Sequence, residues 1–359
     1  MPLTHDDRTA ASPSAFATPV FSDPATAMGP RQGSRRGGRA AIESLLTLTA
    51  FPLDMGGRLA RLRAAYRLVG HERAPTVVVL GGISAHRRAV TLASEGGEAG
   101  WWQGVLGEEG ADLCARYRVL SLDWLGGPDG TTGPGDEACP EPFPAVTTRD
   151  QARLVVRLLD HLGVAHVHAV VSASYGGMVA QHLCTELRGR LGRAIIMGCA
   201  HRPDAMALAR RHIQREILAL VDDARGVALA RALAMTTYRT GAEFNRRFGG
   251  DEAGASLAGY LDYQGRKFAR RFNAQSYACL IDSIDAHRFD PTGLSTLLSL
   301  LGFSTDELCP PALMRAFAGC IPALRQFDVL ETPFGHDAFL CEKERVAAFL
   351  HKTLDGESS

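Results

Sequence analysis

Ser174 lies where an apolar run, 167–171, breaks into small residues and is followed by a helical pattern. This arrangement is typical of a nucleophile elbow, in which a serine occupies a tight turn between a strand and a helix. The turn requires small neighbours, and Ser172 and Gly176 stand two residues away on either side. A serine hydroxyl is a weak nucleophile until a neighbouring base removes its proton. The pattern therefore predicts covalent catalysis at Ser174, provided that a base lies beside it.

Two downstream residues have the types that would complete such a site. Asp306 follows the apolar run 297–303, and His336 follows another strand-like run, 326–330. His336 would act as the base, and Asp306 would hold the histidine tautomer and stabilise the imidazolium. The order serine, acid, histidine is that of an α/β-hydrolase triad. Taken alone, Asp306 could instead be a turn residue and His336 a surface or capping residue.

The negative charge that develops during acyl transfer needs backbone N–H donors. One donor is expected to be the amide of Tyr175, directly after the nucleophile, and the second should follow the strand-like run 76–81. The segment 81–84 (GGIS) suits this role because glycines let the backbone approach the substrate. We therefore assign the second donor to the amide of Ile83. An ordinary glycine-rich turn is the alternative interpretation.

Strand-like and helical patterns alternate from about residue 51 onwards. The strand-like runs lie at 61–70, 76–81, 117–122, 167–171, 194–197, 297–303 and 326–330, and helices are expected at 147–163, 178–187 and 343–354. Continuous apolar strands separated by helices indicate a parallel sheet covered on both faces. Together with the order of the three candidate residues, this predicts an α/β-hydrolase fold with a mostly parallel central sheet.

The segment 203–290 is helical in pattern, rich in Arg and Ala, and has no convincing strand-like run. Because it falls between the serine and the acid, we expect a helical lid at the carboxyl ends of the strands, where ligands gather. A merely structural helical subdomain is the alternative. The core is then expected to comprise 46–202 and 291–359. Residues 1–45, rich in Ala, Ser, Pro, Gly and Arg, are expected to form a disordered tail.

The bulk composition bounds the partners and the location. The 359-residue chain has 39 basic and 39 acidic residues, so nothing suggests nucleic acid or an anionic membrane as a partner. We expect no membrane span and no signal peptide, because no apolar run is long enough for either. The eight cysteines form no C-x-x-C pair, which favours reduced thiols in a cytoplasmic protein. No cluster of metal ligands is apparent, so we expect neither a metal nor a cofactor.

Several segments resemble the homoserine O-acyltransferase family of α/β-hydrolase-fold enzymes, and the resemblance covers nearly all of the chain after residue 50. They are 100–104 (GWWQG), 125–127 (LGG), 131–134 (TTGP), 142–150 (PFPAVTTRD), 270–277 (RRFNAQSY) and 335–340 (GHDAFL). The last two are specific to the family rather than general to hydrolases. The chain departs from the family pattern at Ser172, Tyr175, Gln275 and the segment 82–85, all around the expected acyl pocket.

The resemblance implies a ping-pong transfer from acetyl-CoA or succinyl-CoA to L-homoserine, in methionine biosynthesis. Ser174 would carry the acyl group, and the homoserine hydroxyl would then attack with His336 as base. The resemblance also suggests that Arg215 binds the acceptor carboxylate and Asp337 its ammonium; a lid salt bridge and a helix N-cap are the alternatives. Homoserine and acyl-CoA would be the small-molecule partners of a homodimer. L-serine or another alcohol as acceptor, a serine esterase and a non-catalytic binding module are the alternative functions.

Overall fold

The computed structural model describes residues 39–355, apart from residue 138 and residues 222–223 and 250–252. Within these residues eight strands form one sheet in the order β1-β2-β4-β3-β5-β6-β7-β8. The strands are β1 (Ala40–Pro52), β2 (Arg58–Gly70), β3 (Thr76–Leu80), β4 (Arg118–Leu122), β5 (Val167–Ala173), β6 (Arg193–Met197), β7 (Leu297–Phe303) and β8 (Leu324–Leu330). β2 is antiparallel to both of its neighbours, and all pairs from β4 to β8 are parallel. The predicted mostly parallel sheet is confirmed.

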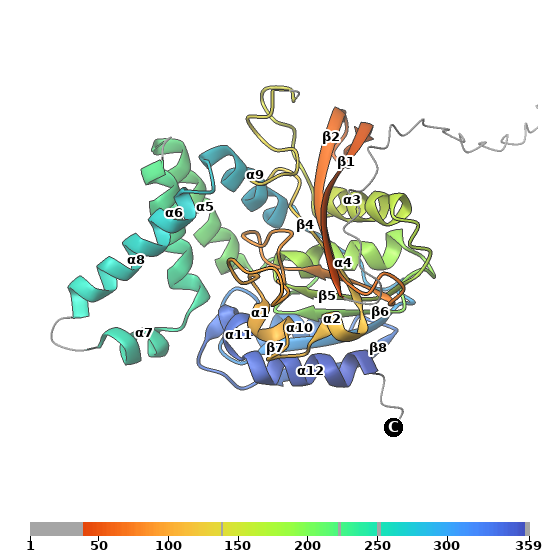
Figure 1. Ribbon diagram of the computed structural model, residues 1–359. Helices are drawn as coiled ribbons and strands as arrows, with labels where there is room; N and C mark the ends of the chain where they lie inside the picture. Colours follow the sequence, from red (N-terminus) through yellow and green to blue (C-terminus); the bar gives the residue numbers. More distant parts are fainter. Residues whose placement is uncertain (1–38, 138, 222–223, 250–252, 356–359) are drawn as a thin grey trace, which may run out of the picture. The chain divides into compact units, whose positions relative to one another are not determined.

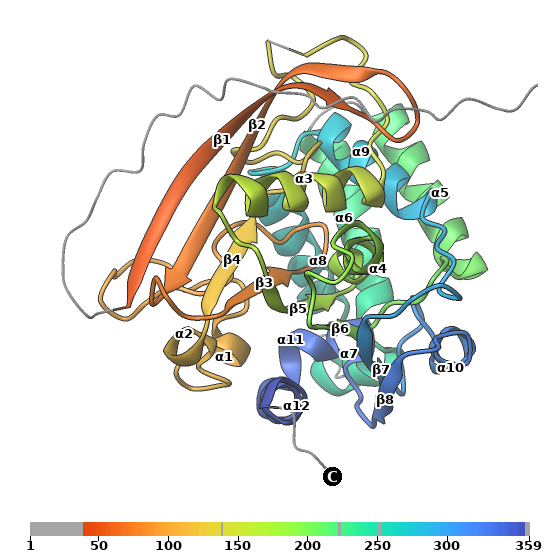
Figure 2. The ribbon, with the colours of Figure 1, turned by 90° about the vertical axis from the view of Figure 1, so that its right-hand side faces the viewer.

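Helices cover both faces of this sheet (Figures 1 and 2). One face carries α3 (Thr148–His161), α4 (Tyr175–Glu186) and α10 (Pro311–Ala318). The other carries α1 (Gln103–Leu106), α2 (Leu113–Arg116), α11 (Ala338–Cys341) and α12 (Lys343–Asp355). Along β3, Val78 and Leu80 join the core on the α3 and α4 side, whereas Val77 and Val79 join the core on the opposite side. Burial on both faces explains why β3 is a continuous apolar run.

A group of helices interrupts the alternation between β6 and β7. In the described residues these helices are α5 (Ala205–Leu220), α6 (Ala224–Tyr238), α7 (Gly241–Phe248), α8 (Ala253–Ala269) and α9 (Ala274–Asp285). They lie together beside the sheet in Figure 1, and we call residues 203–290 the helical insertion. Among the helices that the structure describes, none has the length and apolar character needed to cross a membrane.

The first strand was not expected from the sequence. β1 begins at Ala40 and pairs along its length with β2, so residues 40–45 belong to the sheet rather than to the expected tail. The strand lies at the edge of the sheet, where Leu46 and Leu48 are buried and the threonines between and after them are exposed. Such alternation gives a weaker signal than a continuous apolar run. The remainder of the expected tail, up to residue 38, lies outside the described residues.

Candidate active site

Ser174 occupies a sharp turn between β5 and α4. Its backbone has φ 54° and ψ −124°, a conformation that residues with side chains rarely adopt. Gly176 makes the turn possible, because a Cβ at this position would lie 2.3 Å from the carbonyl oxygen of Leu80. The Gly176 amide donates a 2.7 Å hydrogen bond to the Gly81 carbonyl, which ties the turn to the end of β3. The turn thus has the geometry that the sequence pattern predicts for Ser174.

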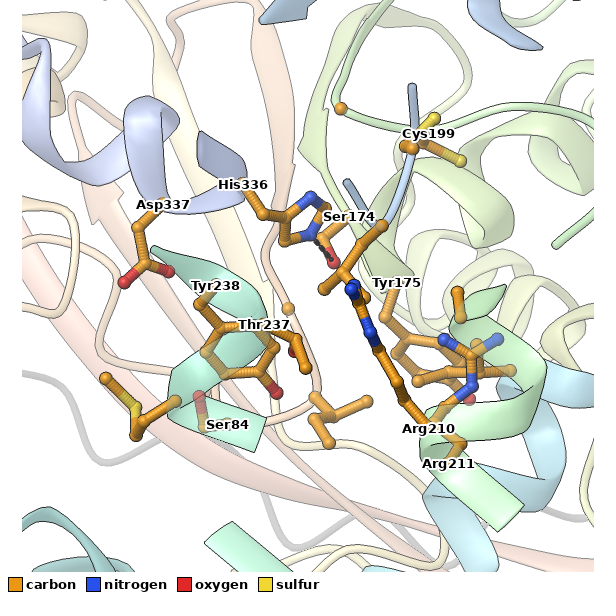
Figure 3. A pocket seen from close by; sticks show the side chains of 18 of the residues that line it. Ser84, Ser174, Tyr175, Cys199, Arg210, Arg211, Thr237, Tyr238, His336 and Asp337 are labelled. Atoms are coloured by element: carbon orange, nitrogen blue, oxygen red, sulfur yellow. Dashed lines mark hydrogen bonds between the residues drawn. The ribbon is translucent and has the colours of Figure 1, made fainter. Parts of the chain in front are cut away.

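Ser174, His336 and Asp306 form a hydrogen-bonded chain across the carboxyl ends of three strands. Ser174 Oγ lies 2.8 Å from His336 Nε2 (Figure 3), and His336 Nδ1 lies 2.7 Å from Asp306 Oδ2. The other carboxylate oxygen of Asp306 accepts hydrogen bonds from the amides of Leu308 and Cys309, at 2.8 and 2.9 Å. These amides fix the orientation of the carboxylate. Nδ1 of the histidine therefore donates to Asp306, which leaves Nε2 to accept a proton from the serine hydroxyl.

Burial and charge act in opposite directions on the proton affinity of His336. Burial lowers the pKa of the buried imidazole, but the charge and hydrogen bond of Asp306 outweigh this effect, so the pKa of His336 is raised above 6.5. The nearby Cys199 thiol lines the same cavity, and burial raises its pKa. The thiol therefore stays protonated and does not compete with Ser174 as a nucleophile.

The loop after β3 lies beside the serine. A Cβ on Gly82 would stand 3.9 Å from Ser174 Cβ and 4.0 Å from its Oγ, so the loop is in van der Waals range. Within the described residues, the Ile83 amide has no protein acceptor. The Tyr175 amide belongs to the first turn of α4, where N–H groups lack partners inside the helix. Both amides expected to hold an oxyanion are therefore available to a ligand.

The turn, the loop and the helical insertion enclose a cavity of about 330 Å³. The core contributes Ser174, Tyr175 and His336, together with the loop 82–85. The described residues of the insertion that line it are mainly polar or charged: Arg210, Arg211, Gln214, Arg231, Thr237, Tyr238, Arg239, Tyr260 and Gln264. The candidate nucleophile thus faces a chamber with cationic side chains on the insertion side (Figure 3).

Asp337 and Arg239 form an ion pair in the wall of this cavity. Arg239 Nε donates a 2.8 Å hydrogen bond to Asp337 Oδ2, and Arg239 also lies 3.5 Å from the buried carboxylate of Glu243. The Asp337 side chain is 12% exposed and that of Arg239 is 17% exposed, so both charges are largely desolvated. The sequence reasoning identified Asp337 and missed Arg239. Nothing in the local pattern separates this arginine from the many others of the insertion; only the folded cavity does.

The structure does not bring Arg215 to the cavity. Among the described residues it is absent from the lining, and its Nη1 lies 2.5 Å from Asp285 Oδ2 and 3.5 Å from Asp282 Oδ1. The preceding residue, Gln214, is buried and lines the cavity. Successive helical residues are rotated by about 100°, so Arg215 faces α9 when Gln214 faces inward. The expected carboxylate-binding role of Arg215 is therefore not supported, and the alternative salt bridge within the insertion is present.

The fold and the geometry around Ser174 define the class of protein. A family model described as the alpha/beta hydrolase fold matches residues 75–342. The match includes the turn at Ser174, the helical insertion and the strands that carry Asp306 and His336. The predicted α/β-hydrolase fold is confirmed.

Individual relatives narrow this class. A homoserine O-succinyltransferase of Xanthomonas campestris pv. campestris is 35% identical over 324 residues, covering 88% of this chain and 84% of the relative. A homoserine O-acetyltransferase of Clavibacter michiganensis subsp. michiganensis is 32% identical over 375 residues, covering 91% and 96%. The crystal structure of homoserine O-acetyltransferase from Staphylococcus aureus superposes with a TM-score of 0.78 at 27% identity, covering 89% and 97%. The chain belongs to the homoserine O-acyltransferase family, a group of acyltransferase enzymes, as its motifs predict.

Proposed function

We propose that this protein transfers the acyl group of acetyl-CoA or succinyl-CoA to the hydroxyl of L-homoserine. The observation that carries the proposal is that Ser174 and His336, backed by Asp306, line the same cavity as the Asp337–Arg239 ion pair. The first could form an acyl-enzyme, and the second offers both charges that a zwitterionic amino acid requires. The names of the relatives, which give an acetyl or a succinyl group and homoserine, support this pairing of donor and acceptor.

In the first half-reaction, Ser174 Oγ attacks the thioester carbonyl while His336 Nε2 takes the hydroxyl proton. The amides of Ile83 and Tyr175 donate to the oxyanion of the tetrahedral intermediate. As the carbon–sulfur bond breaks, His336 returns the proton to the departing thiolate, so that free CoA leaves and Ser174 holds the acyl ester. Asp306 stabilises the imidazolium throughout.

In the second half-reaction, the homoserine hydroxyl takes the place of the thiol. His336 Nε2 removes its proton as the oxygen attacks the acyl carbonyl, and the same two amides hold the oxyanion. Collapse of this intermediate breaks the bond to Ser174, and His336 returns the proton to the serine oxygen. The product is O-acyl-L-homoserine, and the enzyme is regenerated without a cofactor or a metal.

We assign the acceptor's charged groups to Asp337 and Arg239. The carboxylate of Asp337 would bind the ammonium group, and the guanidinium of Arg239 would bind the carboxylate. The two side chains already lie 2.8 Å apart, so they would be held ready while the cavity is empty of acceptor. Because both are largely buried, each charge that the acceptor brings would be paired in a desolvated site rather than left alone.

The helical insertion would act as a lid. An acyl-enzyme is hydrolysed if water reaches it, so a transferase must exclude water from the ester. Several helices of the insertion supply residues that line the cavity around Ser174, which supports this covering role. This gives the insertion a purpose that a purely structural subdomain would not have.

The chemistry also suggests where the reaction belongs. Acylation turns the homoserine hydroxyl into a better leaving group, which suits a later displacement by sulfur in methionine biosynthesis.

We place the protein in the cytoplasm and propose a homodimer formed through the helical insertion. On α5, Met206, Ile213 and Leu220 are exposed at seven-residue spacing, which forms an apolar stripe on one side of the helix. Introducing a glutamate at Leu220 should convert the dimer to a monomer in light scattering.

The deciding experiment is a thiol-release assay with acetyl-CoA and succinyl-CoA in parallel, with and without L-homoserine, and products identified by mass. The expected result is CoA release that depends on homoserine and yields its O-acyl ester. Ser174→Ala should lose the activity by about a thousandfold or more while keeping the wild-type melting temperature. Release without homoserine, with free acid as the product, would show a hydrolase instead. No CoA release with homoserine, together with acyl transfer to L-serine, would show that L-serine is the acceptor.

A further inference from the structure

The loop that carries the Ile83 amide is held from outside through its carbonyl oxygens. Four side chains donate hydrogen bonds to these carbonyl oxygens. Trp124 Nε1 donates to Gly82 and Trp101 Nε1 donates to His86. The Ser121 hydroxyl donates to Arg87, and Arg271 Nη1 donates to Ser84. Trp101, Ser121 and Trp124 belong to the core. Arg271 belongs to the helical insertion, where it follows α8. It is therefore the one contact of this set that links the loop to the insertion.

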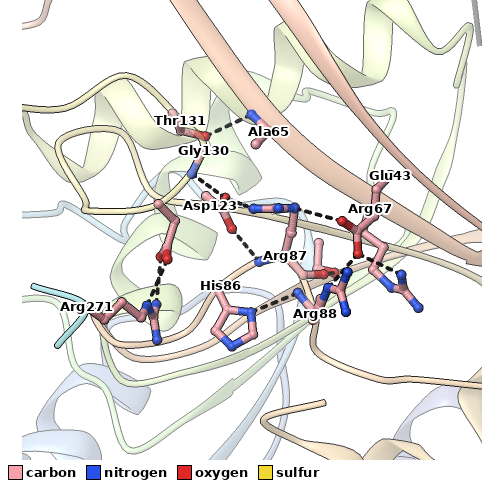
Figure 4. Close-up of polar contacts among 12 residues, drawn as sticks. Glu43, Ala65, Arg67, His86, Arg87, Arg88, Asp123, Gly130, Thr131 and Arg271 are labelled. Carbon is pink, nitrogen blue, oxygen red and sulfur yellow. Dashed lines mark hydrogen bonds and ion pairs between the residues drawn. The ribbon is translucent and has the colours of Figure 1, made fainter. Parts of the chain in front are cut away.

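Arg271 is held by a bidentate ion pair with Asp129. Its Nε and Nη2 donate to the two carboxylate oxygens at 2.8 and 2.7 Å, and Figure 4 shows Arg271 joined to this carboxylate. Nη1 donates to the Ser84 carbonyl at 2.9 Å. The planar guanidinium fits a carboxylate in this fork geometry, which fixes the direction of the remaining donor. The charge of Arg271 also acts on His86 in the loop. Burial is the largest effect that lowers the pKa of His86, and the positive charge of Arg271 is the next.

Two peptide units connect Arg271 to the proposed oxyanion donor. The Ser84–Ala85 unit accepts from Arg271 through its carbonyl and donates through the Ala85 amide to the Gly82 carbonyl, at 2.9 Å. That carbonyl belongs to the same planar peptide unit as the Ile83 N–H, so fixing one end fixes the other. Hydrogen bonds in such a chain polarise one another, and a cation at the start strengthens the donor at the end.

We propose that Arg271 is a positioning residue for acyl transfer: it orients and polarises the Ile83 amide through this two-peptide chain. It thereby couples the seating of the helical insertion to the formation of the oxyanion site. The inference rests on the proposed function, because it assumes that Ile83 donates to a tetrahedral intermediate formed at Ser174. Without Arg271 the Gly82 carbonyl would keep its Trp124 and Ala85 donors, but the Ser84 carbonyl would lose the charged donor that polarises the chain and fixes its far end.

The test compares Arg271→Met and Arg271→Lys with two controls. Asp129→Asn removes the carboxylate partner but keeps the arginine that donates to Ser84, and Arg270→Met changes the exposed neighbouring arginine. For Arg271→Met we expect kcat/KM to fall about 10- to 100-fold, less than the hundred- to thousandfold cost of losing one oxyanion donor outright. The values of kcat/KM for the acyl donor and for homoserine should fall by the same factor, because both half-reactions use the same amides. The dissociation constant of homoserine should not change.

Arg271→Lys should recover part of the loss, Asp129→Asn should lose less than Arg271→Met, and Arg270→Met should behave as wild type. Equal losses in Arg271→Met and Asp129→Asn, or a lowered melting temperature without the paired kinetic effect, would overturn the positioning role. The rate of Ser174 labelling by a p-nitrophenyl phosphonate provides a second readout, because it needs the oxyanion donors but neither CoA nor homoserine. Labelled wild-type protein that lacks transferase activity contradicts the proposed substrates alone. Equal labelling rates in wild type and Arg271→Met overturn the role of Arg271, and failure to label wild type overturns both proposals.

Discussion

His336 and Asp337 are consecutive residues with two different proposed roles: His336 is the base, and Asp337 binds the ammonium group of the acceptor. His336 contacts Ser174, and Asp337 contacts Arg239, all within one cavity. Both residues lie in the short 3₁₀ helix η1 (Gly335–Asp337) after β8, so a single turn sets the distance between the base and the proposed ammonium site. An acceptor anchored at Asp337 would therefore have its hydroxyl at a defined distance from His336, which is the positioning that acyl transfer needs.

The raised pKa of His336 predicts an acid limb in the pH profile. The base must be neutral to take a proton, so kcat/KM for the acyl donor should rise with pH through the pKa of His336, which Asp306 holds above 6.5 against burial. Asp306→Asn should move this limb to lower pH and reduce the plateau by about 10³- to 10⁴-fold. The measurement is the pH dependence of thiol release by both proteins. A limb at the same pH in the two proteins would mean that Asp306 does not set the proton affinity of the base.

Asp337→Asn separates the two half-reactions. An amide has nearly the shape of the carboxylate but cannot balance an ammonium, so kcat/KM for homoserine should fall about 10- to 100-fold, the value of one charged hydrogen bond. The single-turnover burst of CoA release in the absence of acceptor should keep its wild-type rate. Arg215→Met is the matched control, because Arg215 pairs with Asp285 rather than lining the cavity, and it should leave the acceptor kinetics unchanged. A slowed burst in Asp337→Asn would contradict an acceptor-specific role.

At the scale of elements, the site depends on how closely α4 approaches β3. Gly176, in the first turn of α4, lies against the last residue of β3, and its amide bonds to Gly81. This contact sets the spacing between the turn that presents Ser174 and the loop that presents Ile83. A helix that started with a bulkier residue at this position would have to move away from the strand, and the serine would move away from the loop.

Gly176→Ala should therefore lower both activity and stability. The added Cβ would lie 2.3 Å from the Leu80 carbonyl oxygen, a backbone atom that cannot give way easily. We expect a loss of about 1–3 kcal/mol in the free energy of unfolding, the usual cost of overpacking, together with a large loss of kcat. Gly259→Ala, in α8, is the control, because a Cβ at that position would meet nothing within 4 Å. The substitution also replaces a glycine inside a helix, where alanine is more favourable. Urea unfolding should show that variant to be as stable as wild type or more so.

The elements around the sheet could be predicted where burial leaves a pattern in the sequence. β3 and β5 are buried on both faces and read as apolar runs, and Ser174 stands out because small residues must surround the turn. The edge strand β1 gave a weak alternation and was missed. Which side of a helix faces the cavity cannot be predicted in an insertion with arginines on several faces, so the family resemblance points to Arg215 whereas Arg239 lines the cavity. The Trp124 and Arg271 contacts to the loop join segments far apart in sequence and have no local signal.

At the scale of the whole molecule, a pair of histidines, one of them fully buried, joins the core to the helical insertion. His287, just after α9, lies 2.9 Å through Nδ1 from the Thr148 hydroxyl at the start of α3. Its ring packs edge-on against that of His182 in α4, with centroids 5.5 Å apart. Burial lowers the pKa of His287 to about 3 and that of His182 to about 4. Both side chains are therefore neutral in the folded protein near pH 7.

This pair should make the folded state lose stability as the pH falls. Above pH 6.5, where an unfolded histidine is neutral, the pair contributes no pH dependence; below it, the unfolded chain binds protons that the folded protein refuses until about pH 4 for His182 and 3 for His287. Each group then lowers the free energy of unfolding by about 1.4 kcal/mol per pH unit. His287→Gln removes one such group. From pH 6.5 to pH 5 the free energy of unfolding of wild type should therefore fall by about 2 kcal/mol more than that of the variant.

Urea unfolding at both pH values measures this. Thr148→Val breaks the hydrogen bond without removing a titrating group, and its destabilisation should be the same at both pH values. A His287→Gln difference that does not change with pH would mean that His287 is protonated in the folded protein as readily as in the unfolded chain.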